Sequence, residues 1–260
     1  MRLTRVYVET VLAPGAIVEL PRETASHLAK VLRARGGDPI ILFGGDGREY
    51  AGAVESVRGS RVTASVGDGA EVDRESPLAI TLVQCVPRGD RMDFIVQKAT
   101  ELGVTRIVPV LSQRSVVRLD AAQAESKAAH WRAVVVNACE QCGRNRLPAI
   151  AAPVPLIEYL GSSAAGNGSP AAGSPAAETP AARFVLEPDL EAAAAPAALE
   201  TAAHIAVAVG PEGGFGDEEL EAFRIAGFRK LWLGPRILRT ETAAIAALTW
   251  LQTRFGDMRA

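Results

Sequence analysis

The sequence predicts a two-part α/β protein, with a small β-rich barrel at the N-terminus and a larger domain built on a parallel sheet. Within the first 73 residues, short strand-like runs alternate with Gly/Pro turn signals, and one helical stretch interrupts them. From residue 80 onwards, an apolar strand, an amphipathic helix and a second apolar strand follow one another, which implies parallel strands joined by a right-handed crossover. Two Gly/Pro-rich loops near the C-terminus each follow a strand and precede a helix, as ligand-binding loops of open α/β sheets do.

The bulk composition is that of a globular protein. The chain has 260 residues, of which 48% are hydrophobic and 22% charged, so it is long enough to bury a substantial core. No apolar run approaches the roughly 18 residues that span a bilayer. The N-terminal residues alternate like a strand and lack the apolar core of a signal peptide. These features argue against a membrane partner and predict a cytoplasmic protein.

Charge is distributed unevenly along the chain. The net charge of −2 does not by itself indicate a nucleic-acid binder. Residues 1–35 hold six Arg/Lys against three Asp/Glu, and residues 88–146 hold ten against six, whereas residues 161–222 hold one against ten. An acidic segment thus masks two mildly basic regions that would attract phosphate, although solvated surfaces have similar compositions.

Three cysteines, Cys85, Cys139 and Cys142, are too few for a disulfide framework. The last two form a C-x-x-C motif, but zinc would need two further ligands, and the three histidines are scattered without ligand spacing. A redox motif would sit at a strand-to-helix turn, whereas this pair falls late in a helical run. We therefore predict structural thiols and no metal site.

The predicted N-terminal domain covers residues 1–73. Its strand candidates are 5–9, 16–20, 39–43, 49–57 and 61–66, and one helix, 23–35, begins near Pro21 and stops at Gly36-Gly37. Short strands with one helix suggest a small closed barrel, a type of module that often binds RNA. Barrels serve many roles, so the shape alone leaves the function open.

The predicted C-terminal domain covers residues 78–260, after a polar linker at 68–77. Its expected elements are, in order, strand 80–86, helix 91–102, strand 106–111, helix 121–145, strands 183–187, 205–209 and 231–233, and helix 242–255. Residues 161–182 are almost entirely small or polar and cannot bury enough apolar area to fold, so we expect a disordered insertion there. An Ala-rich helix at 189–201 is possible despite its proline.

The two C-terminal loops also carry a family resemblance. Gly210-Pro-Glu-Gly-Gly-Phe215 and Leu233-Gly-Pro-Arg-Ile-Leu-Arg-Thr-Glu-Thr-Ala243 resemble the signature loops of the ribosomal RNA small subunit methyltransferase E family. Supporting similarities lie in His27–Arg33, Lys98–Val104 and Glu140–Pro148. The departures are the small-residue insertion and cysteines at two positions where the family has small residues. Taken alone, either glycine loop is also compatible with an ordinary tight turn.

The resemblance implies a fold, a cofactor and a reaction. Members belong to the SPOUT class, whose parallel-sheet α/β domain contains a trefoil knot. In this chain the resemblance places that domain after a PUA-like β-barrel domain. They transfer a methyl group from S-adenosylmethionine to N3 of a uridine in small-subunit (16S) ribosomal RNA. The implied cofactor residues follow three strands: Leu186, Gly210, Glu212, Gly213, Gly214, Leu233, Gly234 and Leu238.

The resemblance also suggests residues for substrate. Arg239 and Glu241 are the candidate catalytic pair, Arg239 to stabilise negative charge on the uracil and Glu241 to assist proton removal or to fix Arg239. The alternative is that Thr240-Glu241-Thr242 is only a helix N-cap with an acidic first turn. Candidate RNA contacts are Arg5, His27, Lys30, Arg33, Arg114 and Arg144. A solvated helix face explains the His27–Arg33 stretch equally well, and a helix C-terminus complemented by cations explains Arg144.

The last helix is apolar around most of its circumference, which indicates burial within the monomer or an interface. SPOUT enzymes are homodimers, so the resemblance favours an interface. Beside a uridine N3-methyltransferase acting on free RNA or on the assembled 30S subunit, two hypotheses stay open: a SPOUT enzyme acting on ribose 2′-O or another base, and a non-catalytic RNA-binding factor.

Overall fold

The computed structural model describes residues 3–164, 180, 182–187 and 203–258, and its chain divides into two compact units. The first combines Met1–Glu75 with Val136–Leu147, and the second combines Ser76–Val135 with Pro148–Ala260. The sequence-based boundaries at 73 and 78 fall beside the division at Glu75. The second stretch of the first unit, Val136–Leu147, comes from the end of a helix that the sequence analysis placed wholly in the C-terminal domain.

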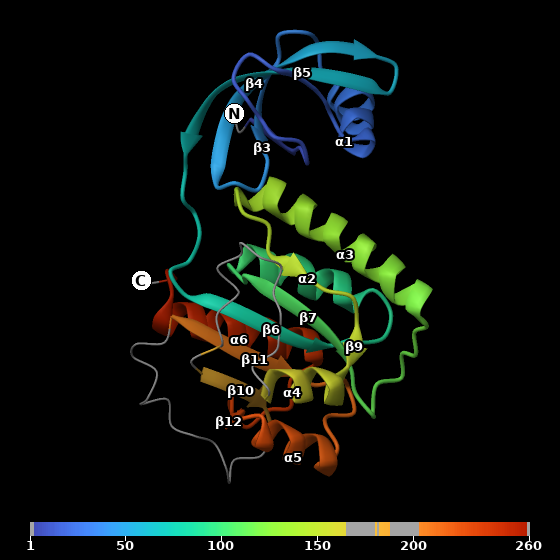
Figure 1. Ribbon diagram of the computed structural model, residues 1–260, viewed down its shortest axis with the longest axis vertical. Coiled ribbons are helices and arrows are strands. Elements are labelled where there is room, and N and C mark those ends of the chain that lie inside the picture. The colour runs from blue at the N-terminus through green and yellow to red at the C-terminus, as the bar shows by residue number, and fades with distance from the viewer. Residues whose placement is uncertain (1–2, 165–179, 181, 188–202, 259–260) are drawn as a thin grey trace. The chain divides into compact units, whose positions relative to one another are not determined.

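A five-stranded sheet forms the first unit (Figure 1). Its strands are β1 (Thr4–Tyr7), β2 (Ile17–Glu19), β3 (Pro39–Phe43), β4 (Arg48–Arg58) and β5 (Arg61–Glu71), in the order β1-β3-β4-β5-β2. β1 runs parallel to β3 and the other pairs are antiparallel. Alternate residues of the strands enclose a core that includes Val6, Leu42, Val54 and Val62. All five predicted strands are confirmed, and β5 extends into the segment expected to be a linker.

The predicted single helix of this unit is two helical segments. α1 (Arg22–His27) continues directly into the π-helical turn η1 (Leu28–Leu32). Arg33 then takes the left-handed conformation, with φ of 52°, and the backbone N–H of Ala34 donates to the carbonyl of Leu28 at 2.9 Å. A left-handed residue ends a helix in this way, so the helix stops before the two glycines expected to end it.

The second unit is built on a seven-stranded sheet whose described pairs are all parallel. It contains β6 (Ala79–Cys85), β7 (Arg106–Leu111), β8 (Ala149–Ile150), β9 (Val154–Pro155), β10 (Ala182–Leu186), β11 (His204–Val209) and β12 (Arg229–Leu231). The order is β12-β10-β11-β6-β7-β8, with β9 paired to β7. The parallel α/β domain predicted from the sequence is therefore confirmed.

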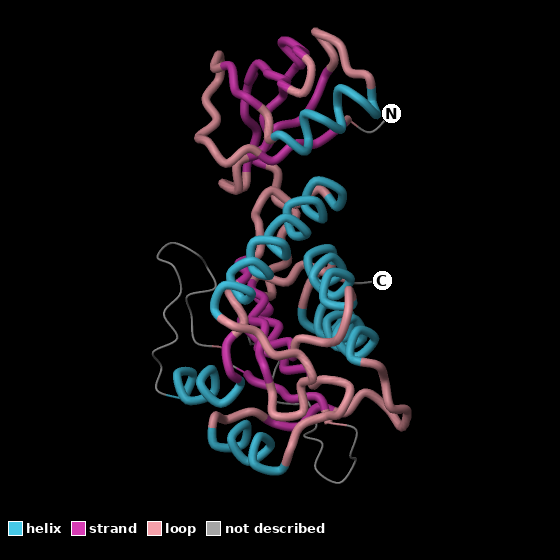
Figure 2. Tube along the Cα trace, turned by 90° about the vertical axis from the view of Figure 1, so that its right-hand side faces the viewer, coloured by secondary structure: helices cyan, strands magenta, loops and turns pink. Residues whose placement is uncertain are grey.

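Helices cover both faces of this sheet (Figures 1 and 2). α4 (Leu156–Ala164) and α5 (Asp217–Ile225) pack together on one face, over a core that contains Val83, Val110 and Phe223. α2 (Arg91–Glu101) packs with α6 (Thr240–Phe255) on the other face. α3 (Ala121–Cys142) begins in the second unit and ends in the first.

Several predicted boundaries are corrected by the structure. β12 ends at Leu231, so Leu233 lies in the loop beyond the strand, and α6 begins two residues before the predicted start at 242. α4 continues through residues 161–164, the first part of the segment expected to be disordered, because Leu156 and Leu160 bury its apolar face. Most of the remaining insertion and the whole of the possible helix 189–201 lie outside the described residues.

Among the described residues, no helix is both long enough and apolar enough to cross a membrane. The trefoil knot stays a prediction that rests on the family resemblance.

Candidate active site

A cavity of about 480 Å³ opens where β10, β11 and β12 end. Ligands of open parallel sheets bind at the carboxyl ends of the strands, and the volume is in the range of sites for cofactor-sized molecules. Its lining combines both Gly/Pro loops with the start of α6: Arg114, Leu186, Glu187, Val209, Gly210, Pro211, Glu212, Gly213, Gly214, Phe215, Leu231, Leu233, Gly234, Arg236, Ile237, Leu238, Arg239, Thr240 and Ala243. All eight residues predicted to bind the cofactor are in this set, together with Arg239 and Arg114.

Close packing or a positive φ angle requires glycine at three positions of these loops. A Cβ atom on Gly210 would stand 3.2 Å from the Phe215 ring, which is tighter than ordinary packing. Gly214 and Gly234 have φ of 66° and 102°, a region that residues with side chains rarely enter. At these three positions the loops carry no side chain, so their backbone lies at the wall of the cavity.

The start of α6 is tied to the first loop from inside. The Thr240 hydroxyl donates to the carbonyl of Gly210 at 2.7 Å and accepts from Nε2 of Gln84 at 2.9 Å. The N-cap position of α6 is Arg239, and no side chain caps the helix there. Thr240 is therefore the first residue of the helix and not its N-cap, whereas Glu241 does lie in the first turn, as the N-cap alternative expected.

One arginine connects the cofactor loop with the candidate catalytic residue Glu241. The guanidinium of Arg91 pairs with Glu212, and its Nε lies 3.9 Å from Oε1 of Glu241. The backbone N–H of Arg88 also approaches Oε1 of Glu212, at 3.4 Å. Oε2 of Glu241 is buried and has no hydrogen-bond partner among the described residues. The ion pair recorded for Glu241 is therefore with α2, whereas the sequence analysis considered a pairing with Arg239.

The loop after β7 is held against the same site by α5. Glu219 is fully buried and accepts from the backbone N–H groups of Gln113, at 2.8 Å, and Gly216, at 2.9 Å. The neighbouring Arg114 is exposed, and its Nη1 donates to the carbonyl of Gly213 at 3.1 Å. Arg114 therefore stands at the rim of the cavity with its charge open to solvent.

Comparison with known proteins decides the family. The RNA methyltransferase domain family matches residues 74–252, and the RNA methyltransferase PUA domain family matches residues 20–67. Ribosomal RNA small subunit methyltransferase E of Mycobacterium tuberculosis is 31% identical over 93% of this chain and 88% of that protein. The same enzyme of Buchnera aphidicola from Schizaphis graminum is 29% identical over 99% and 98%.

The chain belongs to the ribosomal RNA small subunit methyltransferase E family.

Solved structures extend the likeness to the cofactor. A member of this family from Neisseria gonorrhoeae, bound to S-adenosylmethionine, is 35% identical over 99% of this chain and 100% of that one, with a TM-score of 0.84. A putative methyltransferase from Legionella pneumophila, also with bound S-adenosylmethionine, is 35% identical over the same shares, with a TM-score of 0.85. The PUA-like domain and the parallel-sheet methyltransferase domain predicted from the sequence are thereby confirmed.

The residues at the cavity of this family member fit S-adenosylmethionine. That molecule carries a sulfonium and an ammonium, and two acidic residues, Glu187 and Glu212, are among the lining residues. It also carries an apolar adenine face, and Leu186, Leu233 and Leu238 supply apolar surface. Gly210 leaves the backbone accessible at the wall where a larger residue would intrude on Phe215.

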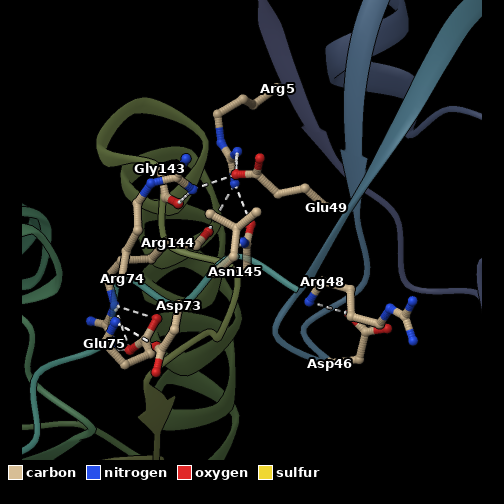
Figure 3. Close-up of polar contacts among 11 residues, drawn as sticks. Arg5, Asp46, Arg48, Glu49, Asp73, Arg74, Glu75, Gly143, Arg144 and Asn145 are labelled. Carbon is tan, nitrogen blue, oxygen red and sulfur yellow. Dashed lines mark hydrogen bonds and ion pairs between the residues drawn. The ribbon is translucent and has the colours of Figure 1, made fainter. Parts of the chain in front are cut away.

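Apart from Arg114 at the rim of the cavity, the predicted RNA contacts fall into two groups. His27, Lys30 and Arg33 are exposed on α1, η1 and the turn that follows. Arg5 and Arg144 are only 6% and 4% exposed. Both lie in a polar cluster inside the first unit, where β1 and β4 meet the segment after α3 (Figure 3).

Acceptors contact both buried guanidinium groups in this cluster, although Nε of Arg5 has no hydrogen-bond partner among the described residues. Arg5 pairs with Glu49 and donates through Nη2 to the carbonyl of Arg144 at 3.2 Å and to Oδ1 of Asn145 at 2.6 Å. Arg144 donates through Nε to Oε2 of Glu75 at 3.0 Å. These contacts fasten the end of α3 to the barrel. An RNA-binding role for these two arginines stays a prediction, and their geometry favours support of the first unit.

The carboxyl of Glu49 is stabilised in its ionised form. Partial burial acts to raise the pKa of Glu49, but hydrogen bonds and charge from Arg74 and Arg5 outweigh it, so the pKa lies below its ordinary value. The nearby Glu140 behaves oppositely. Burial raises its pKa, although the backbone N–H of Tyr7 donates to Oε1 at 3.0 Å.

The three cysteines are free thiols, and Cys85 and Cys139 are buried. Burial raises the pKa of Cys139 to about 12 and also raises that of Cys85. The thiol of Cys139 donates to the carbonyl of Arg146 at 3.9 Å. Groups with such high pKa values are poor nucleophiles at neutral pH, which agrees with the structural role predicted for them.

Sequence reasoning missed three residues that organise the site: Gln84, Arg91 and Glu219. Gln84 offered a weak signal, since it is a polar residue within the otherwise apolar end of a strand. Arg91 and Glu219 resemble ordinary charges in the first turn or two of a helix, and only the fold brings them to the cavity loops.

Proposed function

We propose that the protein methylates N3 of a uridine in small-subunit ribosomal RNA, with S-adenosylmethionine as methyl donor. The observation that carries this proposal is the cavity of the second unit. It lies at the carboxyl ends of β10 to β12, it is lined by both signature loops, and it occurs in a chain whose relatives are enzymes of this kind. When bound, S-adenosylmethionine supplies a methyl group already activated by its sulfonium.

The remaining chemistry falls to the protein. N3 of uracil carries a proton on its Watson–Crick edge, so the base must be unpaired and held in a pocket. We propose that Arg239, at the cavity wall, stabilises the negative charge that develops on the ring as this proton leaves. Glu241 is proposed to accept the proton or to orient the groups around it, because Oε2 is buried and has no hydrogen-bond partner among the described residues.

We further propose that His27, Lys30, Arg33 and Arg114 contact the RNA backbone, since all four are exposed. Arg5 and Arg144 are proposed to support RNA binding indirectly, by stabilising the unit that carries three of the four proposed RNA contacts. A homodimer is supported by α6, whose apolar residues outside its buried stripe, among them Ile245 and Trp250, remain partly exposed. The proposed substrate is the 30S subunit or its RNA, which also makes the cytoplasm the expected location.

The test is methyl transfer from labelled S-adenosylmethionine to small-subunit RNA, naked and in assembled subunits, followed by nucleoside mass spectrometry. We expect N3-methyluridine as the product, at one site, and Arg239→Ala should lower the rate by about 100-fold, the scale of losing one charge-stabilising group. Arg224→Ala, an exposed arginine on α5 outside the cavity lining, is the matched control and should retain most of the activity.

Each alternative has its own outcome in this experiment. A ribose-methylated nucleoside, or another methylated base, would keep the fold and cofactor but overturn the proposed acceptor. If the protein forms no product and binds no cofactor, the result would favour the non-catalytic RNA-binding factor.

A further inference from the structure

Gln84 is a fully buried polar residue in the central strand β6. Its neighbours Val83 and Cys85 point to the core beneath α4 and α5, so Gln84 faces the opposite side of the sheet. Its Nε2 donates two hydrogen bonds, to the carbonyl of Cys85 and to the hydroxyl of Thr240, both at 2.9 Å. A glutamine in the sheet thereby contacts the first turn of α6.

The hydroxyl of Thr240 also forms a hydrogen bond to the loop proposed to bind the cofactor. A threonine hydroxyl has one proton to donate and lone pairs to accept. Because the Gln84 amide donates to the oxygen, the single proton is free to point at Gly210, whose carbonyl lies 2.7 Å away. The chain of donors therefore runs in one direction, from Gln84 through Thr240 to Gly210, and Thr240 is only 4% exposed.

Packing alone does not explain a glutamine at this position. Its Oε1 is buried and has no hydrogen-bond partner among the described residues. Leaving a buried amide oxygen unpaired is unfavourable, and an apolar side chain of similar volume would avoid this cost. What the glutamine provides is the oriented donor to Thr240.

We infer that Gln84 and Thr240 are positioning residues of the cofactor site, which together fix the carbonyl of Gly210. This inference rests on the proposed function, because it concerns the site proposed for S-adenosylmethionine. Fixing Gly210 sets the start of the loop 210–214 relative to the start of α6, where Arg239 and Glu241 stand. The buried hydrogen bonds of Gln84 and Thr240, called the relay below, thus fix the proposed cofactor loop relative to the proposed catalytic residues.

The decisive variants are Thr240→Val, which removes the hydroxyl while keeping the shape, and Thr240→Ser, which keeps the hydroxyl. In calorimetric titration of the full chain with S-adenosylmethionine, we expect Thr240→Val to weaken binding at least 10-fold, and Thr240→Ser to stay within 3-fold of the wild type. Thr253→Val is the matched control, since the Thr253 hydroxyl bonds within α6, to the carbonyl of Thr249 at 2.8 Å, and is exposed. It should leave affinity unchanged.

A second variant covers the case in which Thr240→Val does not fold. Gln84→Met keeps the volume and removes the donor, and we expect a 3- to 10-fold loss of affinity with a circular dichroism spectrum like that of the wild type. Folded Thr240→Val or Gln84→Met protein that binds as tightly as the wild type would overturn the relay alone. Absence of binding by the wild type would instead overturn the proposed function, and the relay with it.

Discussion

The guanidinium group of Arg5 is enclosed by acceptors that lie far apart in the sequence. Glu49 is 44 positions away, and the carbonyl of Arg144 and the side chain of Asn145 are 139 and 140 positions away. A buried cation must be paired and hydrogen-bonded, otherwise its desolvation is very costly. The sequence analysis predicted an RNA contact for Arg5, but the partners that enclose its side chain are brought together only by the fold.

Glu49→Gln tests this account at the scale of the residue. The substitution leaves Arg5, whose side chain is 4% exposed, without its carboxylate, so we expect a loss of about 2–4 kcal/mol in the free energy of unfolding of the first unit. Glu19→Gln is the matched control, because the Glu19–Arg61 pair has side chains 54% and 70% exposed. It should cost less than about 1 kcal/mol. Urea denaturation measures both, and equal effects would contradict the account.

The Arg5–Glu49 pair also predicts how the stability of the fold changes with pH. Because the folded protein lowers the pKa of Glu49, this carboxyl stabilises the fold fully above the ordinary value of 4.5. The contribution is lost as the pH falls below 4.5 and through the lower pKa of the folded state. The difference in stability between wild type and Glu49→Gln should therefore shrink on acidification in this range.

At the scale of the element, η1 presents a basic edge to solvent. Lys30 and Arg33 are exposed, and the left-handed conformation of Arg33 turns the chain away from the helix. π-helical turns are rare and often occur at functional sites. This geometry agrees with the RNA contact proposed for the segment.

Arg33→Ala is expected to weaken RNA binding about 3- to 10-fold and to reduce the salt dependence of the affinity by about one counterion, as loss of one phosphate contact does. Arg58→Ala, an exposed arginine at the end of β4, removes the same charge elsewhere in the unit. Filter binding across a salt series compares them. If the two variants lose the same RNA affinity, the loss reflects the net charge of the protein, and the proposed contact between Arg33 and RNA is contradicted.

Elements with strong local signals could be predicted, and those set by tertiary contacts could not. β3 and β7 match their predicted bounds, since apolar runs flanked by turns define them. The end of β12 and the start of α6 were misplaced, and Thr240, at that helix start, is bonded to Gln84 and Gly210, which lie far from it in the sequence. The eight residues predicted to bind the cofactor all line the cavity, and all except Leu186 lie in the two motif loops, which are continuous in sequence. Gln84 and Arg91 reach the site only through the fold.

At the scale of the whole molecule, the chain interleaves its two units. The first unit includes the end of α3, which follows β6 and β7, the first two of the seven strands in the second unit's sheet. The RNA contacts proposed on η1 and the cofactor cavity nevertheless belong to different units. Variants of one should therefore leave the binding function of the other intact, as the Arg33 and Thr240 variants would reveal.

The cavity at the carboxyl ends of β10 to β12 is the proposed site of S-adenosylmethionine. Gly213→Leu places a side chain at its wall, where a Cβ already approaches Arg114 at 3.4 Å. Gly161→Leu adds the same side chain on α4, where nothing lies within 4 Å of the new Cβ. In calorimetric titration we expect one cofactor bound per wild-type chain, at least 100-fold weaker binding by Gly213→Leu, and unchanged binding by Gly161→Leu. Equal affinity of all three proteins would contradict the placement of the cofactor.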